Sequence, residues 1–178
     1  MKKLLIRFLC VLVLLLAFST ESFAMAWRNP HLKVCIVGNN RNNPMMKRAF
    51  QEWQTRSGNT VRFTFVQKTN QANITVYFVQ KINYVKQKEG NKIGLTYQTY
   101  RGNTMLSAKI QIAASAQGSY RTLRQDEVYT AMLHEIGHAI GLGHSSNPKS
   151  VMYYAAGVNQ ITNDDIKTLK KEYGVAVE

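Results

Sequence analysis

Three of the four histidines in this 178-residue chain fall within eleven residues, from His134 to His144, and this spacing constrains the fold more than any other feature. His134 and His138 are four residues apart, so on a helix both rings project from the same face. Gly141 allows the backbone conformation that ends a helix and turns the chain, which lets His144 approach the same point from a loop. The small residues Ala131, Gly137 and Gly141 lie beside the histidines and are expected to leave room for a metal and a substrate.

Three imidazoles that converge on one point form a characteristic metal site. Ligand distances of about 2.0–2.1 Å with one coordination position left open are typical of a catalytic zinc ion and not of a closed structural site. We therefore predict one Zn²⁺ ion bound by His134, His138 and His144, with a water molecule whose pKa falls towards about 7 as the fourth ligand. Glu135 follows His134 by about 100° round the helix, where it can take a proton from that water and pass it to the leaving amine.

The remaining hydrophobic patterns predict a mixed architecture. Alternating or continuous apolar runs indicate about five strands, whereas apolar residues at helical spacing indicate three helices. Pro44 marks the start of the first helix, and Thr162 with Asp165 resembles a capping box at the start of the last. Cys35 lies in an apolar run, which favours a small buried role. The predicted strands are residues 32–37, 61–65, 74–78, 93–100 and 105–112, and the helices follow Pro44, carry the histidines and follow Thr162.

The first 24 residues have the composition of a signal peptide. Lys2, Lys3 and Arg7 precede an apolar run of about eleven residues, too short to span a bilayer, and Ser22 and Ala24 supply small residues for a signal peptidase. We expect cleavage after Ala24 and export of the protein, which would be secreted or periplasmic. Residues 25–178 are then expected to form one domain, since this length suits a single core.

Net charge is the most unusual feature of the composition. The chain carries 23 Lys+Arg against 10 Asp+Glu, a formal charge of +13, which becomes +11 without the leader. Residues 28–124 hold 16 cationic side chains and only two acidic ones, Glu52 and Glu89. This charge fits two interpretations, a solvated surface without a partner or attraction to an anionic surface or polymer. Nucleic acid is not expected, because no basic and aromatic motif of recognised form is present. Calcium sites built from several carboxylates are not expected within 28–124, and oligomeric state has no signal in the sequence.

The motif region resembles that of a known peptidase family. The run HEIGHAIGLGH, followed by Ser145 and by Ser150-Val151-Met152-Tyr153, resembles the metzincin peptidases and, within them, the matrixin branch. The resemblance implies an α+β fold of the zincin or metzincin type, with a twisted mixed sheet, an active-site helix and a Met-turn. It also implies that residues 25–178 are a minimal matrixin-like catalytic domain and that Met152 packs beneath the zinc without ligating it.

Two further assignments follow from this resemblance. The segment Gly94-Leu95-Thr96-Tyr97 resembles the edge strand along which matrixins align an extended substrate. Tyr154 occupies the place where some other metzincins carry a tyrosine that reaches the zinc, whereas matrixins usually have proline. We hypothesise that Tyr154 assists the oxyanion; otherwise it forms a wall of the substrate pocket.

Two functions from different classes fit the sequence. The first is a secreted or periplasmic zinc endopeptidase that acts on protein or peptide substrates. The alternative is a non-catalytic module, stapled by zinc, whose basic face docks on anionic envelope or host surfaces. Glu135 discriminates between them, because binding alone has no need of a carboxylate beside the metal ligands.

Overall fold

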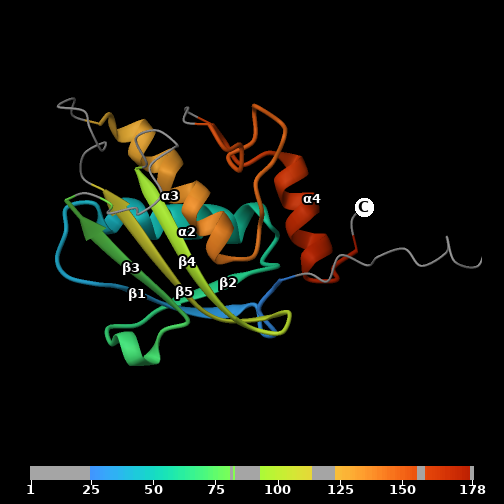
Figure 1. Cartoon of the computed structure of the whole chain (residues 1–178), viewed down its shortest axis with the longest axis horizontal. Coiled ribbons are helices and arrows are strands. Elements are labelled where there is room, and N and C mark those ends of the chain that lie inside the picture. The colour runs from blue at the N-terminus through green and yellow to red at the C-terminus, as the bar shows by residue number, and fades with distance from the viewer. Residues whose placement is uncertain (1–24, 81, 83–92, 114–122, 156–158, 177–178) are drawn as a thin grey trace, which may run out of the picture.

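The fold combines one mixed sheet with three α-helices in the described part of the chain (Figure 1). The computed structural model describes residues 25–80, 82, 93–113, 123–155 and 159–176. The predicted α+β class and the predicted order of elements are confirmed, and a short 3₁₀ turn is added before β3. The elements are β1 (His31–Ile36), α2 (Asn43–Arg56), β2 (Arg62–Phe65), η1 (Thr69–Gln71), β3 (Ile74–Val79), β4 (Gly94–Arg101), β5 (Thr104–Ala113), α3 (Gln125–Ala139) and α4 (Asn163–Glu172).

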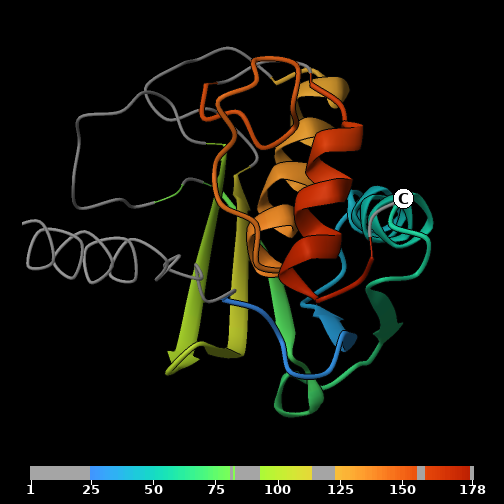
Figure 2. The same cartoon turned by 90° about the vertical axis from the view of Figure 1, so that its right-hand side faces the viewer.

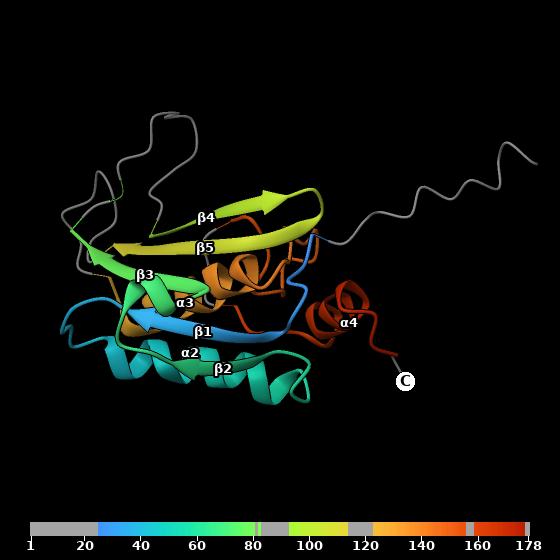
Figure 3. The same ribbon diagram turned by 90° about the horizontal axis from the view of Figure 1, so that it is seen from below.

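The five strands form one sheet in the order β2-β1-β3-β5-β4. The first four of these run parallel, whereas β4 is antiparallel to β5 and lies at the edge of the sheet (Figure 3). All three α-helices lie on the same face of the sheet, whereas the short turn η1 lies against the other face (Figure 2 and Figure 3). The segment predicted to align a substrate therefore belongs to an edge strand, as expected.

A single hydrophobic core fills the space between the sheet and the helices. The apolar stripe of α2 packs inward, and its Phe50 ring lies edge-on to Phe63 at a centroid distance of 4.9 Å. Trp53 is fully buried and donates a hydrogen bond of 2.9 Å from Nε1 to the carbonyl oxygen of Leu133 in α3. Burial of a large apolar side chain stabilises the fold by roughly 1.5–3 kcal/mol. Cys35 is 2% exposed, which confirms its predicted buried position.

The end of α3 is held by aromatic side chains from both ends of the described chain. Trp27 donates from Nε1 to the carbonyl oxygen of Ala139 at 2.8 Å, and the Tyr173 hydroxyl donates to that of Ile140 at 2.9 Å. The last carbonyls of a helix have no partner within it, so these bonds satisfy groups that would otherwise need water. Burial raises the pKa of Tyr173, which keeps this hydroxyl a donor. The helix that carries the histidines is therefore fixed in place by the core.

The predicted leader, residues 1–24, lies outside the described residues, so its cleavage stays a prediction. The described elements share one buried cluster that runs from Trp27 to Leu169. No helix in the described part of the chain combines the length and the apolar character needed to cross a membrane.

Candidate metal centre

The metal-binding helix ends where the sequence predicted. Gly141 adopts a φ of +105°, a left-handed conformation that favours glycine. The N–H of Leu142 bonds to the carbonyl of Gly137, and the N–H of Gly141 bonds to that of His138, both at 2.9 Å. This pair of bonds is a Schellman motif, which satisfies the final carbonyls and reverses the chain direction. The turn brings His144 back towards the helix.

The three histidine side chains converge at this turn. One potential ligand atom from each of His134, His138 and His144 lies within 4.8 Å of the others. The Nε2 atoms of His134 and His138 are 3.1 Å apart, and the ring of His144 lies 4.8 Å from that of His138 between centroids. The predicted convergence of two helical histidines with one from the following loop is confirmed.

The protonation of the two helical histidines fits a metal ion. His134 Nδ1 lies 2.6 Å from the carbonyl oxygen of Val151, and His138 Nδ1 lies 2.8 Å from that of Leu142. A carbonyl oxygen only accepts, so each Nδ1 carries the proton and each Nε2 presents a lone pair. Two lone pairs in such close contact need a cation between them, and a tetrahedral zinc ion would hold two nitrogens about 3.3 Å apart. The donor set is therefore positioned to bind zinc.

Glu135 is held against the edge strand β4. Its side chain is 7% exposed, and the Thr96 hydroxyl oxygen lies 2.6 Å from its Oε2 and 3.0 Å from its backbone carbonyl oxygen. The hydroxyl has one proton, and the shorter distance places it on the carboxylate. A Cβ atom at Gly94 would lie 2.4 Å from Glu135 Cγ and 2.6 Å from Oε1. Gly94 thus leaves space for the carboxylate, and Thr96 orients it.

Met152 packs directly against the metal-binding helix. It is 1% exposed, and its Sδ atom lies 2.2 Å from the point where a Cβ of Gly137 would be. The expectation that Gly137 leaves room for a metal and a substrate is therefore wrong, because this space is filled by Met152. It is also wrong for Gly141, where a Cβ would lie 2.9 Å from the backbone oxygen of Met25. The helical repeat correctly places Gly137 near the histidines. It does not show that Met152, in the turn beneath the helix, fills the space where a side chain of Gly137 would be.

A buried hydrogen-bond network holds the Met-turn. Ser150 Oγ accepts from the backbone N–H of Met152 at 2.8 Å and donates to Asp165 Oδ1. Asp165 is 4% exposed, and its Oδ2 accepts from Thr162 N at 2.7 Å and from Thr162 Oγ1 at 2.8 Å. The capping box predicted at Thr162 is confirmed. Asp165 also connects the start of α4 to the Met-turn through Ser150. The sequence did not predict this second role, because helix capping alone explains an aspartate at this position.

Comparison with known proteins identifies the family. A sequence model of the matrixin peptidases matches residues 25–174, most of the chain. The chain belongs to the matrixin family. Members of this family are zinc-dependent, in keeping with the histidine geometry described above.

Individual relatives resemble parts of this matrixin. A protein of Trichoplusia ni ascovirus 2c, named after the matrix metalloproteinases, is 25% identical over 144 residues, which are 74% of this chain and 29% of that protein. Metalloendoproteinase 1 of Glycine max is 28% identical over 138 residues, 72% of this chain and 44% of the relative. Human matrilysin is 49% identical over 49 residues, 25% of this chain and 18% of matrilysin. The chain thus spans less than half the length of each of these relatives.

The other residues of the matrixin's edge strand divide between the two faces of the sheet. Gln98 donates from Nε2 to the carbonyl oxygen of His138, so it joins Thr96 in fixing β4 to α3. Tyr97 is 45% exposed on the opposite face, where Lys109 Nζ lies 5.0 Å from its ring centroid. Leu95 is half-buried. Of the four predicted substrate-strand residues, Gly94 and Thr96 therefore contact the site through Glu135. The sequence could have indicated this contact with Glu135 only through the spacing of Gly94 and Thr96, since residues two apart in a strand lie on the same face.

Tyr154 lies beyond the Met-turn of the matrixin and is exposed. Its side chain is 71% exposed, and its ring centroid lies 4.6 Å from that of Tyr153. Hydrogen bonding to Tyr154 raises the pKa of Tyr153 above its ordinary value. The proposed role of Tyr154 at the oxyanion stays a prediction, and the neighbouring residues 156–158 and 114–122 lie outside the described residues.

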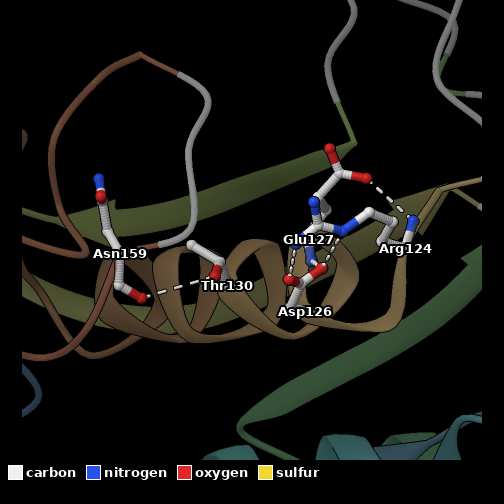
Figure 4. Close-up of polar contacts among 5 residues, drawn as sticks. All are labelled: Arg124, Asp126, Glu127, Thr130 and Asn159. Atoms are coloured by element: carbon white, nitrogen blue, oxygen red, sulfur yellow. Dashed lines mark hydrogen bonds and ion pairs between the residues drawn. The ribbon is translucent and has the colours of Figure 1, made fainter.

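Helix α3 begins with a cluster of charged side chains (Figure 4). The backbone N–H of Arg124 donates to Glu127 Oε2 at 2.9 Å, and the Arg124 guanidinium pairs with Asp126. This hydrogen-bonded pair lowers the pKa of the Asp126 carboxyl and raises that of Arg124. Two carboxylates in the first turn also interact favourably with the helix dipole. One turn further along, Thr130 Oγ1 lies 3.5 Å from the carbonyl oxygen of Asn159.

Proposed function

We propose that this matrixin is a zinc-dependent endopeptidase that hydrolyses peptide bonds in protein or peptide substrates. The observation that carries this proposal is the convergence of three imidazoles beside the helix that also carries Glu135, whose carboxylate accepts a hydrogen bond from Thr96. When bound, zinc acidifies a water molecule and polarises the scissile carbonyl. Glu135 then accepts a proton from the attacking water and delivers it to the leaving amine. We expect the hydrogen bond from Thr96 to hold this carboxylate in one orientation during the transfer.

The edge of β4 supports binding of an extended peptide. Only one side of this strand is paired in the described sheet, so the backbone N–H and C=O groups on the other side are available to a substrate. A peptide added as a further strand would gain main-chain hydrogen bonds that do not depend on its sequence. This geometry favours cleavage within unfolded or extended segments of a protein.

The proposed site of action is outside the cytoplasm. The support is the composition of residues 1–24, with basic residues, an apolar run and a small-residue cleavage site. We propose that the leader is removed after Ala24 and that the enzyme is secreted or periplasmic. Sequencing the N-terminus of the exported protein tests this, and a mature form that begins with Met1 would contradict it.

A cleavage assay tests the peptidase proposal. Purified protein with zinc should cleave a denatured protein substrate, and both a chelator and Glu135→Ala should abolish the cleavage. Zinc content, measured in parallel, should remain near one ion per chain in Glu135→Ala, because Glu135 is not a ligand. If the wild type binds zinc but cleaves no substrate over a broad range of conditions, the zinc-stapled binding module becomes the better interpretation.

A separate substitution tests Tyr154. We propose that its hydroxyl contacts the developing oxyanion, in which case Tyr154→Phe should lower kcat by at least about tenfold and leave zinc content unchanged. Full kcat/KM in Tyr154→Phe would limit this residue to the wall of the pocket.

A further inference from the structure

The face of the sheet opposite the helices has an unusual charge composition. We call this the open face. None of the five strands contains an aspartate or a glutamate, although together they contain four Lys and Arg residues, namely Lys33, Arg62, Arg101 and Lys109. All four are exposed. Uncompensated cations on one surface create a positive potential that attracts anions.

The acidic residues of the described chain lie on the other side of the sheet. Glu52 belongs to α2, Asp126 and Glu127 to α3, and Asp164 to α4, and these helices all cover the opposite face (Figure 2). The helical layer therefore mixes both signs of charge. Because the Debye length at physiological salt is about 8 Å, the helical carboxylates are largely screened from a ligand on the open face.

The open face also contains a recess with cationic walls. A cavity of about 660 Å³ is lined by Arg28, Lys33 and Arg101 together with the amide side chains of Gln71 and Asn73. Asn73 also borders a second recess of about 420 Å³, which extends along the sheet towards Lys109. The two recesses share this residue and so form neighbouring parts of one binding surface.

The spacing of the cations suits a chain better than a small ion. Arg62 lies on β2, at one edge of the sheet. Arg101 lies at the end of β4, at the other edge, so four strand intervals separate these two residues. At about 4.8 Å per interval, these charges extend over roughly 19 Å of the sheet. One phosphate or sulfate ion would contact only part of this surface, whereas a linear polymer with repeated anionic groups would contact all of it.

The neutral groups between the cations distinguish among anionic polymers. Amides and hydroxyls such as Gln71, Asn73 and Thr99 offer donors and acceptors to sugar hydroxyls. A flat bilayer would not enter the recess. Unpaired nucleotides are usually bound by aromatic stacking, and the exposed tyrosine here, Tyr97, already lies against Lys109.

We propose that the open face binds a linear acidic polysaccharide, with its anionic groups between Arg28, Lys33 and Arg101 and its sugar hydroxyls against the neighbouring amides. This site lies across the sheet from the helix that carries the histidines, so a bound polymer leaves the metal centre accessible. Binding would hold the protein on a matrix of the polymer whether or not it cleaves peptides, so the inference does not depend on the peptidase proposal.

Calorimetry with defined polymers tests the inference. Heparin and polygalacturonate should bind the purified protein, with affinity that falls as salt rises, whereas neutral dextran should not bind. The open-face variant should bind both acidic polymers at least about tenfold more weakly, and a control variant with the same loss of charge on α4 should stay within about threefold of the wild type. The open-face variant is Arg28→Gln/Lys33→Gln/Arg101→Gln, and the control is Lys167→Gln/Lys170→Gln/Lys171→Gln.

Three results would overturn the inference. Equal weakening in the two variants would show that net charge alone attracts the polymer. Tighter binding of a thymidine oligonucleotide or of phosphatidylserine vesicles would show that the ligand class is wrong. In the wild type, which needs no variant to fold, bound heparin should protect Lys33 and Lys109 from acetylation more than Lys167 and Lys170, and equal protection would contradict the assigned surface.

Discussion

The contact between Thr96 and Glu135 predicts the effect of one nearly isosteric substitution. Thr96→Val replaces the hydroxyl, 2.6 Å from Glu135 Oε2, with a methyl group of similar size. A hydrogen bond to a charged group stabilises its partner by about 1.5–3 kcal/mol. Because Glu135 is 7% exposed, water can replace the lost donor only in part. If the orientation of the carboxylate matters in the transition state, kcat/KM should fall by about 10- to 150-fold, since 1.36 kcal/mol corresponds to about tenfold.

The assay separates this effect from a loss of structure. With a quenched fluorescent peptide, Thr96→Val should lower kcat while KM changes little, which is typical of an interaction made in the transition state. Thr96→Ser keeps the hydroxyl and should recover most of the activity. Thr99→Val, on the exposed face of the same strand, serves as the matched control. If Thr96→Val keeps kcat/KM within a factor of two of the wild type, the hydroxyl does not orient Glu135 for catalysis and the reasoning fails.

Three further predictions concern the support of the site. Gly137→Ala places a Cβ 2.2 Å from Met152 Sδ, and this overpacking should lower the free energy of unfolding, measured in urea, by about 1–3 kcal/mol. Gly143→Ala is the control and should change this free energy little, because the space around Gly143 is open. Asp165→Ala removes a buried acceptor and should lower the free energy of unfolding by about 3 kcal/mol. Asp164→Ala, at the exposed neighbour, should lower it by less than about 1 kcal/mol. Equal losses in the two variants would show that the buried network contributes nothing to stability. Removal of zinc by a chelator should lower Tm reversibly, because an ion at a thousandfold its Kd stabilises the native state by about 4 kcal/mol; an unchanged Tm would contradict a folded-state metal site.

Features that depend on short stretches of backbone were predictable from the sequence. The convergence of His134, His138 and His144 needed only the helical repeat and a glycine that ends the helix, and both lie within eleven residues. The capping box at Thr162 was predictable for the same reason. Strand and helix order also followed from local periodicity, although the pairing of strands did not. Periodicity identifies the buried face of each strand but carries no information on which neighbour it pairs with.

Features that depend on packing between distant segments were not predictable in this way. Thr96 and Glu135 are 39 residues apart in sequence, and their contact requires that β4 lie antiparallel at the edge of the sheet, beside α3. Helical periodicity placed Gly137 near the histidines but did not show that Met152 would fill the space beside it.

These two contacts share a physical cause that links the fold to the chemistry. A zinc site of this kind needs both faces of one short helix, because one presents the ligands and the other must be fixed in the core. At Gly137 the missing side chain lets the Met-turn approach closely beneath the helix, and at Gly94 it lets the Glu135 carboxylate lie against the edge strand. Each glycine thus allows two elements to pack closely, and this close packing fixes the position of Met152 in one case and of Glu135 in the other. Substitution at Gly137 should therefore act first on stability, and substitution at Gly94 should act first on kcat, since its clash is with the proposed base itself.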